Sequence, residues 1–434
     1  MTRTMAGTPH APEPAPDDLR AANARSGSAA RTRRRFRRGV RTIGLALAAL
    51  VVLVIVVFVV VIQRAQPPHP GSFYAAPSPL PSGAPGTIIR SEPLADLAAG
   101  AHGWKILYLS TSYTGKPTAI SGVVIVPATA APPGGRRVLA FAHGTVGVAS
   151  GCAPSLQGAA HDYFIDGLPV FLKAGYAVVA TDYQGLGTPG PNPYLVGKAA
   201  AMSVLDSVRA IHNLSQAAAG TTFAVWGASQ GGHAALFTGQ YAASYAPDLT
   251  LVGVAAAAPA SALIPLFERR IGGDFGNLLS AYTIDAWTRV YPNLTLDQIV
   301  TAAARPIVRN IATYCISNMT QALPAVLHAR LLKIVYLNKL PWDSAPWKAE
   351  LDANSPGHSK IPVPIFIGQG VEDALVSPDL QAAFVKGLCT AGETVVYRTY
   401  PGVGHVDAGP AVAPDAEAWI ADRFAGKAVP STCG

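Results

Sequence analysis

The chain has 434 residues, of which 50% are hydrophobic, and a formal net charge of +8. This composition excludes a largely disordered protein, and the length fits one large domain or two ordinary ones. Residues 1–41 contain ten arginines and three carboxylates, a net charge of +7. The rest of the chain is close to neutral, and nothing in it predicts nucleic-acid binding.

An uncharged apolar run occupies residues 42–62. As a helix rising about 1.5 Å per residue, it would cross a bilayer core of roughly 30 Å. We therefore predict a transmembrane helix that acts as an uncleaved signal anchor, since a cleaved signal peptide usually has a shorter apolar stretch. The arginines flank this run on its N-terminal side only, which predicts a cytoplasmic N-terminus and an extracellular remainder. Cleavage of the anchor would instead give a secreted protein.

The composition divides the chain into four expected regions. Residues 1–41 are expected to form a basic, disordered cytoplasmic tail, followed by the anchor at 42–62. Residues 63–87 are rich in proline and glycine and are expected to form a stalk. Residues 88–434 are expected to form the folded, catalytic domain.

Within that domain, short β-branched runs alternate with alanine-rich stretches of helical period. The expected strands are 119–128, 137–143, 176–182, 222–227, 251–258, 363–368 and 394–400. The expected helices are 199–214, 230–246 and 378–389, with a further amphipathic helix at 322–340. This alternation is typical of a mostly parallel sheet with helices on both faces, whose active site lies at the carboxyl ends of the strands.

The pentapeptide G-A-S-Q-G at residues 227–231 lies between an expected strand and an expected helix. A serine on such a turn is typical of a nucleophile elbow, so we predict Ser229 as a nucleophile. Gly227 and Gly231 fit this interpretation because a tight turn leaves no room there for β-carbons. The alternative is a serine that only caps the helix.

A serine needs a base and an acid to become a nucleophile. His405 follows the last expected strand, and Asp373 follows the strand before it, which gives the order serine, acid, histidine. Glu372 and Asp407 are the alternative acids.

An oxyanion hole requires two backbone donors. One is expected from Gln230, the residue after the nucleophile, and the other from the loop after strand 137–143. In that loop either Gly144 or Thr145 supplies the second N–H; Thr145 is favoured because its hydroxyl could add a donor. His143 is expected to pack behind the loop.

The four cysteines are even in number and none has C-x-x-C spacing. Two disulfides fit an exported domain, and metal ligation does not fit this spacing. Buried free thiols are the alternative. The G-x-G-x-x-G match at 185–190 continues into prolines instead of a helix, so no cofactor is predicted.

Seven segments in this order resemble the secretory lipase family of α/β-hydrolases: 143–155, 182–197, 205–210, 227–232, 354–357, 368–376 and 402–405. The resemblance runs from about Pro93 to Cys433. It implies an α/β-hydrolase fold, a Ser229, Asp373 and His405 triad, and hydrolysis of carboxylic esters including triacylglycerols. It also implies disulfides pairing Cys152 with Cys315 and Cys389 with Cys433.

We therefore expect a membrane-anchored serine hydrolase, a lipase or esterase, that cleaves acylglycerols or other lipid esters through an acyl-enzyme. A helical cap at about 261–357 would bind the acyl chain and exclude water, although most of its aromatic residues are expected to form its own core. The expected partners are the ester substrate and the membrane, without nucleic acid or an obligate protein partner. The alternatives are an acyltransferase that uses the same triad on envelope lipids and a non-catalytic surface binding protein.

Overall fold

The computed structural model describes residues 42–53, 55–56, 60, 63, 65–95, 97, 100–156 and 164–433. The chain forms two compact units, Met1–Gln63 and Arg64–Gly434. In the first unit the described residues are helical and exposed. None of the described helices is long and apolar enough to cross a membrane, so the predicted transmembrane helix is without structural support. The expected tail, residues 1–41, and part of the expected anchor lie outside the described residues.

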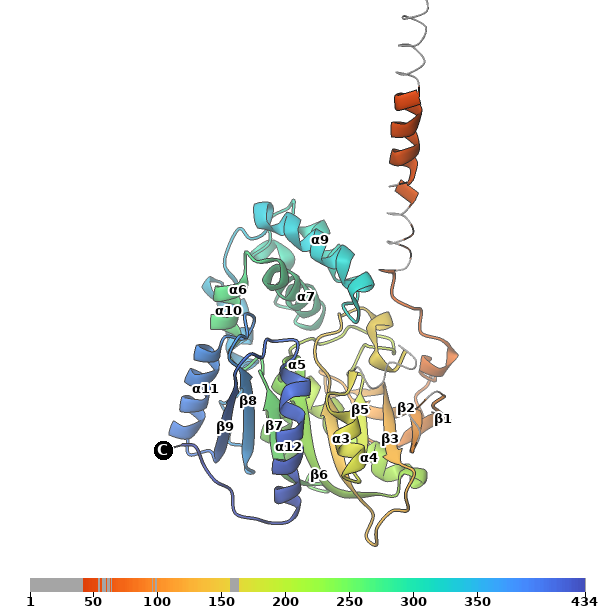
Figure 1. Ribbon diagram of the computed structural model, residues 1–434, viewed down its shortest axis with the longest axis vertical. Coiled ribbons are helices and arrows are strands. Elements are labelled where there is room, and N and C mark those ends of the chain that lie inside the picture. Colours follow the sequence, from red (N-terminus) through yellow and green to blue (C-terminus); the bar gives the residue numbers. More distant parts are fainter. Residues whose placement is uncertain are drawn as a thin grey trace, which may run out of the picture. The chain divides into compact units, whose positions relative to one another are not determined.

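The second unit is built on a sheet whose described strands follow the order β1-β2-β3-β5-β4-β6-β7-β8-β9 (Figure 1). The strands are β1 (Ile88–Pro93), β2 (Ala101–Thr111), β3 (Pro117–Pro127), β4 (Arg136–Ala142), β5 (Ala177–Thr181), β6 (Ala219–Ala228), β7 (Thr250–Ala257), β8 (Ile365–Gly370) and β9 (Val395–Tyr400). Pairing is antiparallel from β1 to β5 and parallel from β5 to β9. The predicted mostly parallel sheet is confirmed.

The seven expected strands correspond to β3–β9, with ends that differ by at most three residues. Strands β1 and β2 were not predicted. The side chains of β1 are exposed or only half-buried, and the first half of β2 is mostly not buried either. Neither therefore shows the continuous apolar run that marks a strand buried on both faces.

Helices cover both faces of the sheet because its strands are apolar on both sides. In β4, Val138 and Ala140 pack on one face and Leu139 and Phe141 on the other, as successive side chains of a strand alternate. The first face is covered by α4 (Gly197–Asn213), α5 (Gln230–Tyr245) and α11 (Pro378–Thr390), and the second by α3 (Leu168–Lys173) and α12 (Ala408–Phe424).

The three expected helices of the sheet layers are α4, α5 and α11. Helices α3 and α12 were not predicted. Helix α12 contains Pro414 in its interior, which removes a backbone hydrogen bond from the helix. Burial of Val412, Trp419 and Ile420 against the sheet outweighs this cost.

Between β7 and β8 the chain forms five described α-helices, which we call the helical insertion: α6 (Leu263–Arg270), α7 (Asp274–Val290), α8 (Arg305–Ile311), α9 (Met319–Val335) and α10 (Ala345–Ala353). In Figure 1 it forms a separate layer above the sheet. It has its own apolar core, where the rings of Trp287 and Trp347 stack with centroids 6.3 Å apart. Most of its aromatic side chains are packed in that core.

Part of the expected stalk packs on the domain. Phe73 and Tyr74 are buried and contact the side of the sheet around Leu107. The Tyr74 hydroxyl also lies 3.0 Å from Ser155 Oγ. The composition of this proline-rich segment did not indicate that its two aromatic residues pack on the domain.

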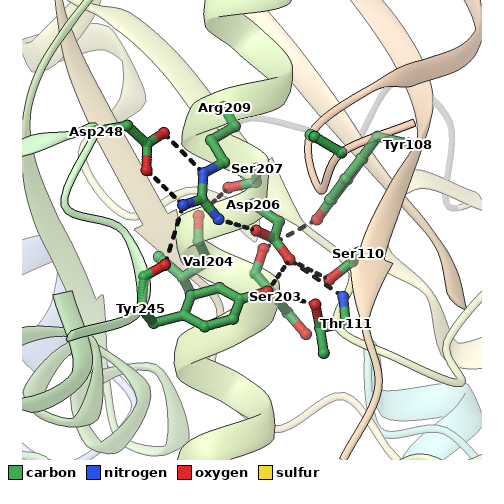
Figure 2. A network of polar contacts seen from close by, with 12 residues as sticks. Tyr108, Ser110, Thr111, Ser203, Val204, Asp206, Ser207, Arg209, Tyr245 and Asp248 are labelled. Carbon is green, nitrogen blue, oxygen red and sulfur yellow. Dashed lines mark hydrogen bonds and ion pairs between the residues drawn. The ribbon is translucent and has the colours of Figure 1, made fainter. Parts of the chain in front are cut away.

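A buried polar cluster on α4 fixes β2 to the helical layer. The Asp206 carboxylate accepts hydrogen bonds from Ser110 Oγ at 2.7 Å, Tyr245 Oη at 2.9 Å and Arg209 Nη1 at 2.8 Å. Figure 2 shows these side chains converging from β2, α4 and the end of α5. Burial raises the pKa of Asp206 against the effect of these donors. Asp206 and Arg209 belong to segment 205–210 of the resemblance, and the cluster gives both residues a structural role.

Candidate active site

Ser229 stands at the turn between β6 and α5, with φ 56° and ψ −117°. A positive φ is strained for a residue with a side chain, and such strain persists only where the surroundings impose it. A β-carbon on Gly231 would lie 1.9 Å from the carbonyl oxygen of Ala142, and one on Gly227 would lie 2.4 Å from the same oxygen. Both positions therefore require glycine, and the turn presents the serine hydroxyl at the start of α5.

The structure brings Ser229, His405 and Asp373 together. His405 Nε2 lies 2.9 Å from Ser229 Oγ, and His405 Nδ1 lies 2.8 Å from Asp373 Oδ2. The three residues follow the carboxyl ends of β6, β9 and β8, all in the parallel part of the sheet. Glu372 and Asp407, the alternative acids, are exposed.

The Asp373 carboxylate is buried and held by several donors. Oδ1 accepts the N–H groups of Leu375 and Val376, each at 2.8 Å, and Oδ2 accepts Gln369 Nε2 at 3.2 Å as well as His405. Burial by itself would raise the pKa of Asp373, but the hydrogen bonds and the charge of His405 outweigh it and hold the pKa below its usual range. An ionised carboxylate accepts the Nδ1–H of the imidazole and leaves the Nε2 lone pair facing the serine.

A role for Gln369 in the site was not predicted from the sequence. It is fully buried at the end of β8, and its amide also donates to the carbonyl oxygens of Gly370 and Val376, each at 3.0 Å. The only signal was a polar residue inside an otherwise apolar strand. It braces the turn that carries Asp373.

The loop after β4 contains the expected second oxyanion donor. The Gly144 carbonyl oxygen lies 2.7 Å from His143 Nδ1. Because a trans peptide is planar, the N–H of Thr145 points in the opposite direction to that carbonyl, away from His143. A β-carbon on Gly144 would lie 3.5 Å from the carbonyl oxygen of Ala228, so the loop runs beside the residue that precedes the serine.

The other predicted donor, Gln230, is the first residue of α5. The first N–H groups of a helix have no acceptor within it, so this one is available to a ligand. The Thr145 hydroxyl, by contrast, is engaged with the Tyr194 hydroxyl at 2.8 Å.

A buried polar network behind this loop was not predicted from the sequence. The Asp182 carboxylate accepts Ser121 Oγ at 2.6 Å and the N–H of Ser155 at 2.9 Å, while the Asp182 carbonyl oxygen lies 3.2 Å from His143 Nε2. The His143 ring packs on Tyr183, with centroids 4.4 Å apart. Burial lowers the pKa of His143 and raises that of Asp182. An acid directly after a buried strand was the available signal.

Two disulfides stand where the resemblance implies them. Cys389–Cys433 joins the end of α11 to the C-terminal segment, and Cys152–Cys315 joins the segment after the His143 loop to the helical insertion. Gly147 of that loop also pairs with Cys315 through a β-bridge. The insertion is thereby tied to the loop beside Ser229. Among the described residues, no three His, Cys, Asp or Glu side chains gather as metal ligands.

This arrangement places the chain among the α/β-hydrolases, whose nucleophile occupies a strained strand-to-helix turn and whose acid and base follow later strands. Residues 153–431 match the sequence pattern of the secretory lipase family, and the chain belongs to that family. Membership supports a hydrolase of the lipase or esterase kind.

Curated relatives cover most of the chain. It is 27% identical over 378 residues to a probable inactive lipase of Mycobacterium tuberculosis (strain CDC 1551 / Oshkosh), with 83% of each chain covered. It is 24% identical to Lipase A of Moesziomyces aphidis over 368 residues, and this match covers 79% of this chain and 77% of the relative.

Solved structures are similar in fold. Candida antarctica lipase A in its closed state gives a TM-score of 0.71 at 22% identity, over 84% of this chain and 88% of that one. The rice cell wall degrading esterase LipA from Xanthomonas oryzae gives a TM-score of 0.66 at 21% identity, over 79% and 99%.

Proposed function

We propose that this chain is a serine carboxylic ester hydrolase in which Ser229, His405 and Asp373 form the catalytic triad. The observation that carries the proposal is the unbroken line of contacts from Ser229 Oγ through His405 to Asp373, at 2.9 and 2.8 Å. A serine becomes a useful nucleophile when a base takes its proton, and a histidine oriented by a carboxylate is such a base.

In the first half of the reaction, Ser229 Oγ attacks the ester carbonyl carbon while His405 Nε2 takes the hydroxyl proton. The N–H groups of Gln230 and Thr145 stabilise the negative charge that develops on the carbonyl oxygen. His405 then protonates the leaving alkoxide, and the alcohol departs from an acyl-Ser229. Water, deprotonated by His405, attacks this acyl group and releases the carboxylic acid.

The substrates we propose are lipid esters, acylglycerols included. Family membership supports this class, as does the Malassezia globosa relative named a secreted triacylglycerol lipase. Tyr194 adds a local argument, because it contacts Thr145 beside the site and belongs to the apolar core of the helical insertion. As a cap, that insertion would hold an acyl chain and exclude water.

We further propose that residues 42–62 anchor the protein in the cell membrane with the catalytic domain outside. The length of the apolar run and the arginines on its N-terminal side support this orientation. The two disulfides fit an oxidising compartment.

The test is hydrolysis of p-nitrophenyl esters, from acetate to palmitate, by the full chain and by Ser229→Ala. We expect the alanine variant to lose about 10⁴-fold or more in rate, because the nucleophile is removed. Ser244→Ala, at an exposed serine on α5, is the matched control and should keep the full rate.

Equal rates in the wild-type chain and Ser229→Ala would overturn the hydrolase proposal. Ser229-dependent formation of a new ester with an added alcohol, without free acid, would point to an acyltransferase. A chain whose Ser229 neither turns over esters nor reacts with a fluorophosphonate would be a non-catalytic binding protein.

A further inference from the structure

Helix α9 of the insertion carries large apolar side chains on its solvent-exposed face. Their exposed fractions are 84% for Met319, 45% for Leu323, 43% for Leu327, 51% for Leu331 and 84% for Ile334. Residues three or four apart lie on one face of a helix. These five therefore form a continuous stripe along α9, which we call the outer stripe.

The opposite face of α9 packs on α7 and α8 through smaller groups. Ala325 and Ala329 are fully buried there, together with Leu332. A helix that borders water usually buries its largest apolar residues and exposes polar ones. Here two alanines are buried while three of the four leucines are exposed, so packing within the insertion does not account for the stripe. An exposed apolar patch of this kind marks an interaction surface.

The charges around the stripe indicate its partner. Helix α9 contains no carboxylate. Near its C-terminal end, Arg330 and Lys333 both contact Asp274, at 3.0 and 2.6 Å, and Lys339 follows exposed in the next segment. Asp343, four residues after Lys339, is exposed as well, so three cations and two carboxylates lie in this region, which is apolar with a small excess of positive charge. This combination complements an anionic lipid surface, where leucines enter the acyl layer and basic groups meet the headgroups.

We infer that the outer stripe of α9 docks the protein on an anionic lipid–water surface. The link to catalysis rests on the proposed function, since a hydrolase of lipid esters meets its substrate in such a surface. The Cys152–Cys315 disulfide ties the insertion that carries α9 to the loop beside Ser229. Docking through α9 would thus hold the site next to the lipid from which its substrate comes.

The first experiment places an environment-sensitive fluorophore on Leu327→Cys in the full chain. All four native cysteines are in disulfides, so the introduced thiol is labelled selectively. Vesicles of phosphatidylglycerol and phosphatidylcholine in equal parts should shift the emission to shorter wavelength, and pure phosphatidylcholine should do so less. The same label on Lys386→Cys, exposed on α11, is the matched control and should not shift.

An unchanged Leu327 label with both kinds of vesicle would overturn the inference. If the Leu327 label already emitted at shorter wavelength than the Lys386 label without vesicles, the inference would also be overturned. If that shift grew with protein concentration, the stripe would be covered by a second copy of the chain. If it were independent of concentration, another segment of the same chain, such as residues 42–62, would cover it.

The second experiment measures the double variant Leu327→Gln with Leu331→Gln. On emulsified triacylglycerol mixed with anionic lipid, its rate should fall about tenfold, because two apolar contacts with the surface are lost. On soluble p-nitrophenyl butyrate its rate should stay within about twofold of wild type, since neither residue belongs to the triad or the oxyanion loop. Equal losses on both substrates would contradict docking.

The two proposals fail in different ways. Absence of Ser229-dependent turnover on p-nitrophenyl butyrate would overturn the hydrolase proposal and leave the fluorescence result standing. Normal butyrate turnover with no response of the Leu327 label would overturn docking alone.

Discussion

In the sheet and its flanking helices, apolar side chains alternate between two covered faces, whereas the helical insertion leaves one of its own faces uncovered. Nine large apolar side chains are exposed in the described part of Arg64–Gly434, and seven of them belong to the insertion. The other two, Val371 and Val406, lie on the turns that carry Asp373 and His405. Exposed apolar surface is therefore concentrated in the insertion and around the candidate site, which indicates contact with an apolar partner there.

The largest expected effect is the loss of activity in Asp373→Asn, which distinguishes catalysis by residues of the sheet layers from docking by the helical insertion. Asp373→Asn should lower kcat about 10⁴-fold on soluble and emulsified esters alike, because an amide leaves His405 in the wrong tautomer. The outer-stripe variant should affect emulsified esters only. Initial rates on p-nitrophenyl butyrate and on a triacylglycerol emulsion test this, with exposed Glu372→Gln as the control that keeps its rate. A loss confined to emulsions would contradict the catalytic assignment of Asp373.

The two disulfides test whether the insertion depends on its link to the rest of the domain. They join residues 163 and 44 positions apart, and removal of either should cost about 2–5 kcal/mol of unfolding free energy. Loop entropy makes the cost of losing Cys152–Cys315 greater by about 1 kcal/mol. Denaturant unfolding of the double alanine variants measures both values.

Only loss of Cys152–Cys315 should also slow the turnover of soluble esters, because that bond reaches the loop beside Ser229. Equal activity of the two double variants would mean that the insertion keeps its place without the bond.

The smallest expected effect concerns a partly buried acid within the sheet layers. Asp166 contacts the first turn of α12, where a β-carbon on Gly409 would lie 2.1 Å from a carboxylate oxygen. Burial raises the pKa of Asp166 to about 7. The unfolded chain loses this proton near pH 4, so folding stability falls as the pH rises from about 4 to about 7 and stays lower above that.

Asp166→Asn should therefore raise Tm at pH 8 and leave it nearly unchanged at pH 4. Thermal unfolding at both pH values measures the difference. An equal shift at pH 4 and pH 8 would mean that packing, and not ionisation, causes it. Asp373 shows the contrast, since its four donors keep its pKa below the usual range despite burial.

The site was largely predictable because each of its parts follows a strand. A turn between a buried strand and a helix indicated Ser229 as the candidate nucleophile, and chain order after the last two strands indicated His405 and Asp373 as the residues that the structure brings into contact with it. Gln369 and the Asp182 network were not predictable, since a single polar residue after an apolar run does not indicate its partners. His143 was expected behind the loop, but its contact with the Gly144 carbonyl, which orients the Thr145 amide, depends on the folded geometry.

The sequence by itself determined the seven strands from β3 to β9, the elbow and the helices α4, α5 and α11 on one face of the sheet, because full burial requires apolar runs of recognisable length and period. Only the tertiary structure decided the half-buried strands β1 and β2, the packing of Phe73 and Tyr74, and which face of α9 meets solvent. Helix α9 is apolar on both sides, so its periodicity does not distinguish them. The inner face became the one whose alanines allow α7 and α8 to approach closely, and the larger side chains remained outside.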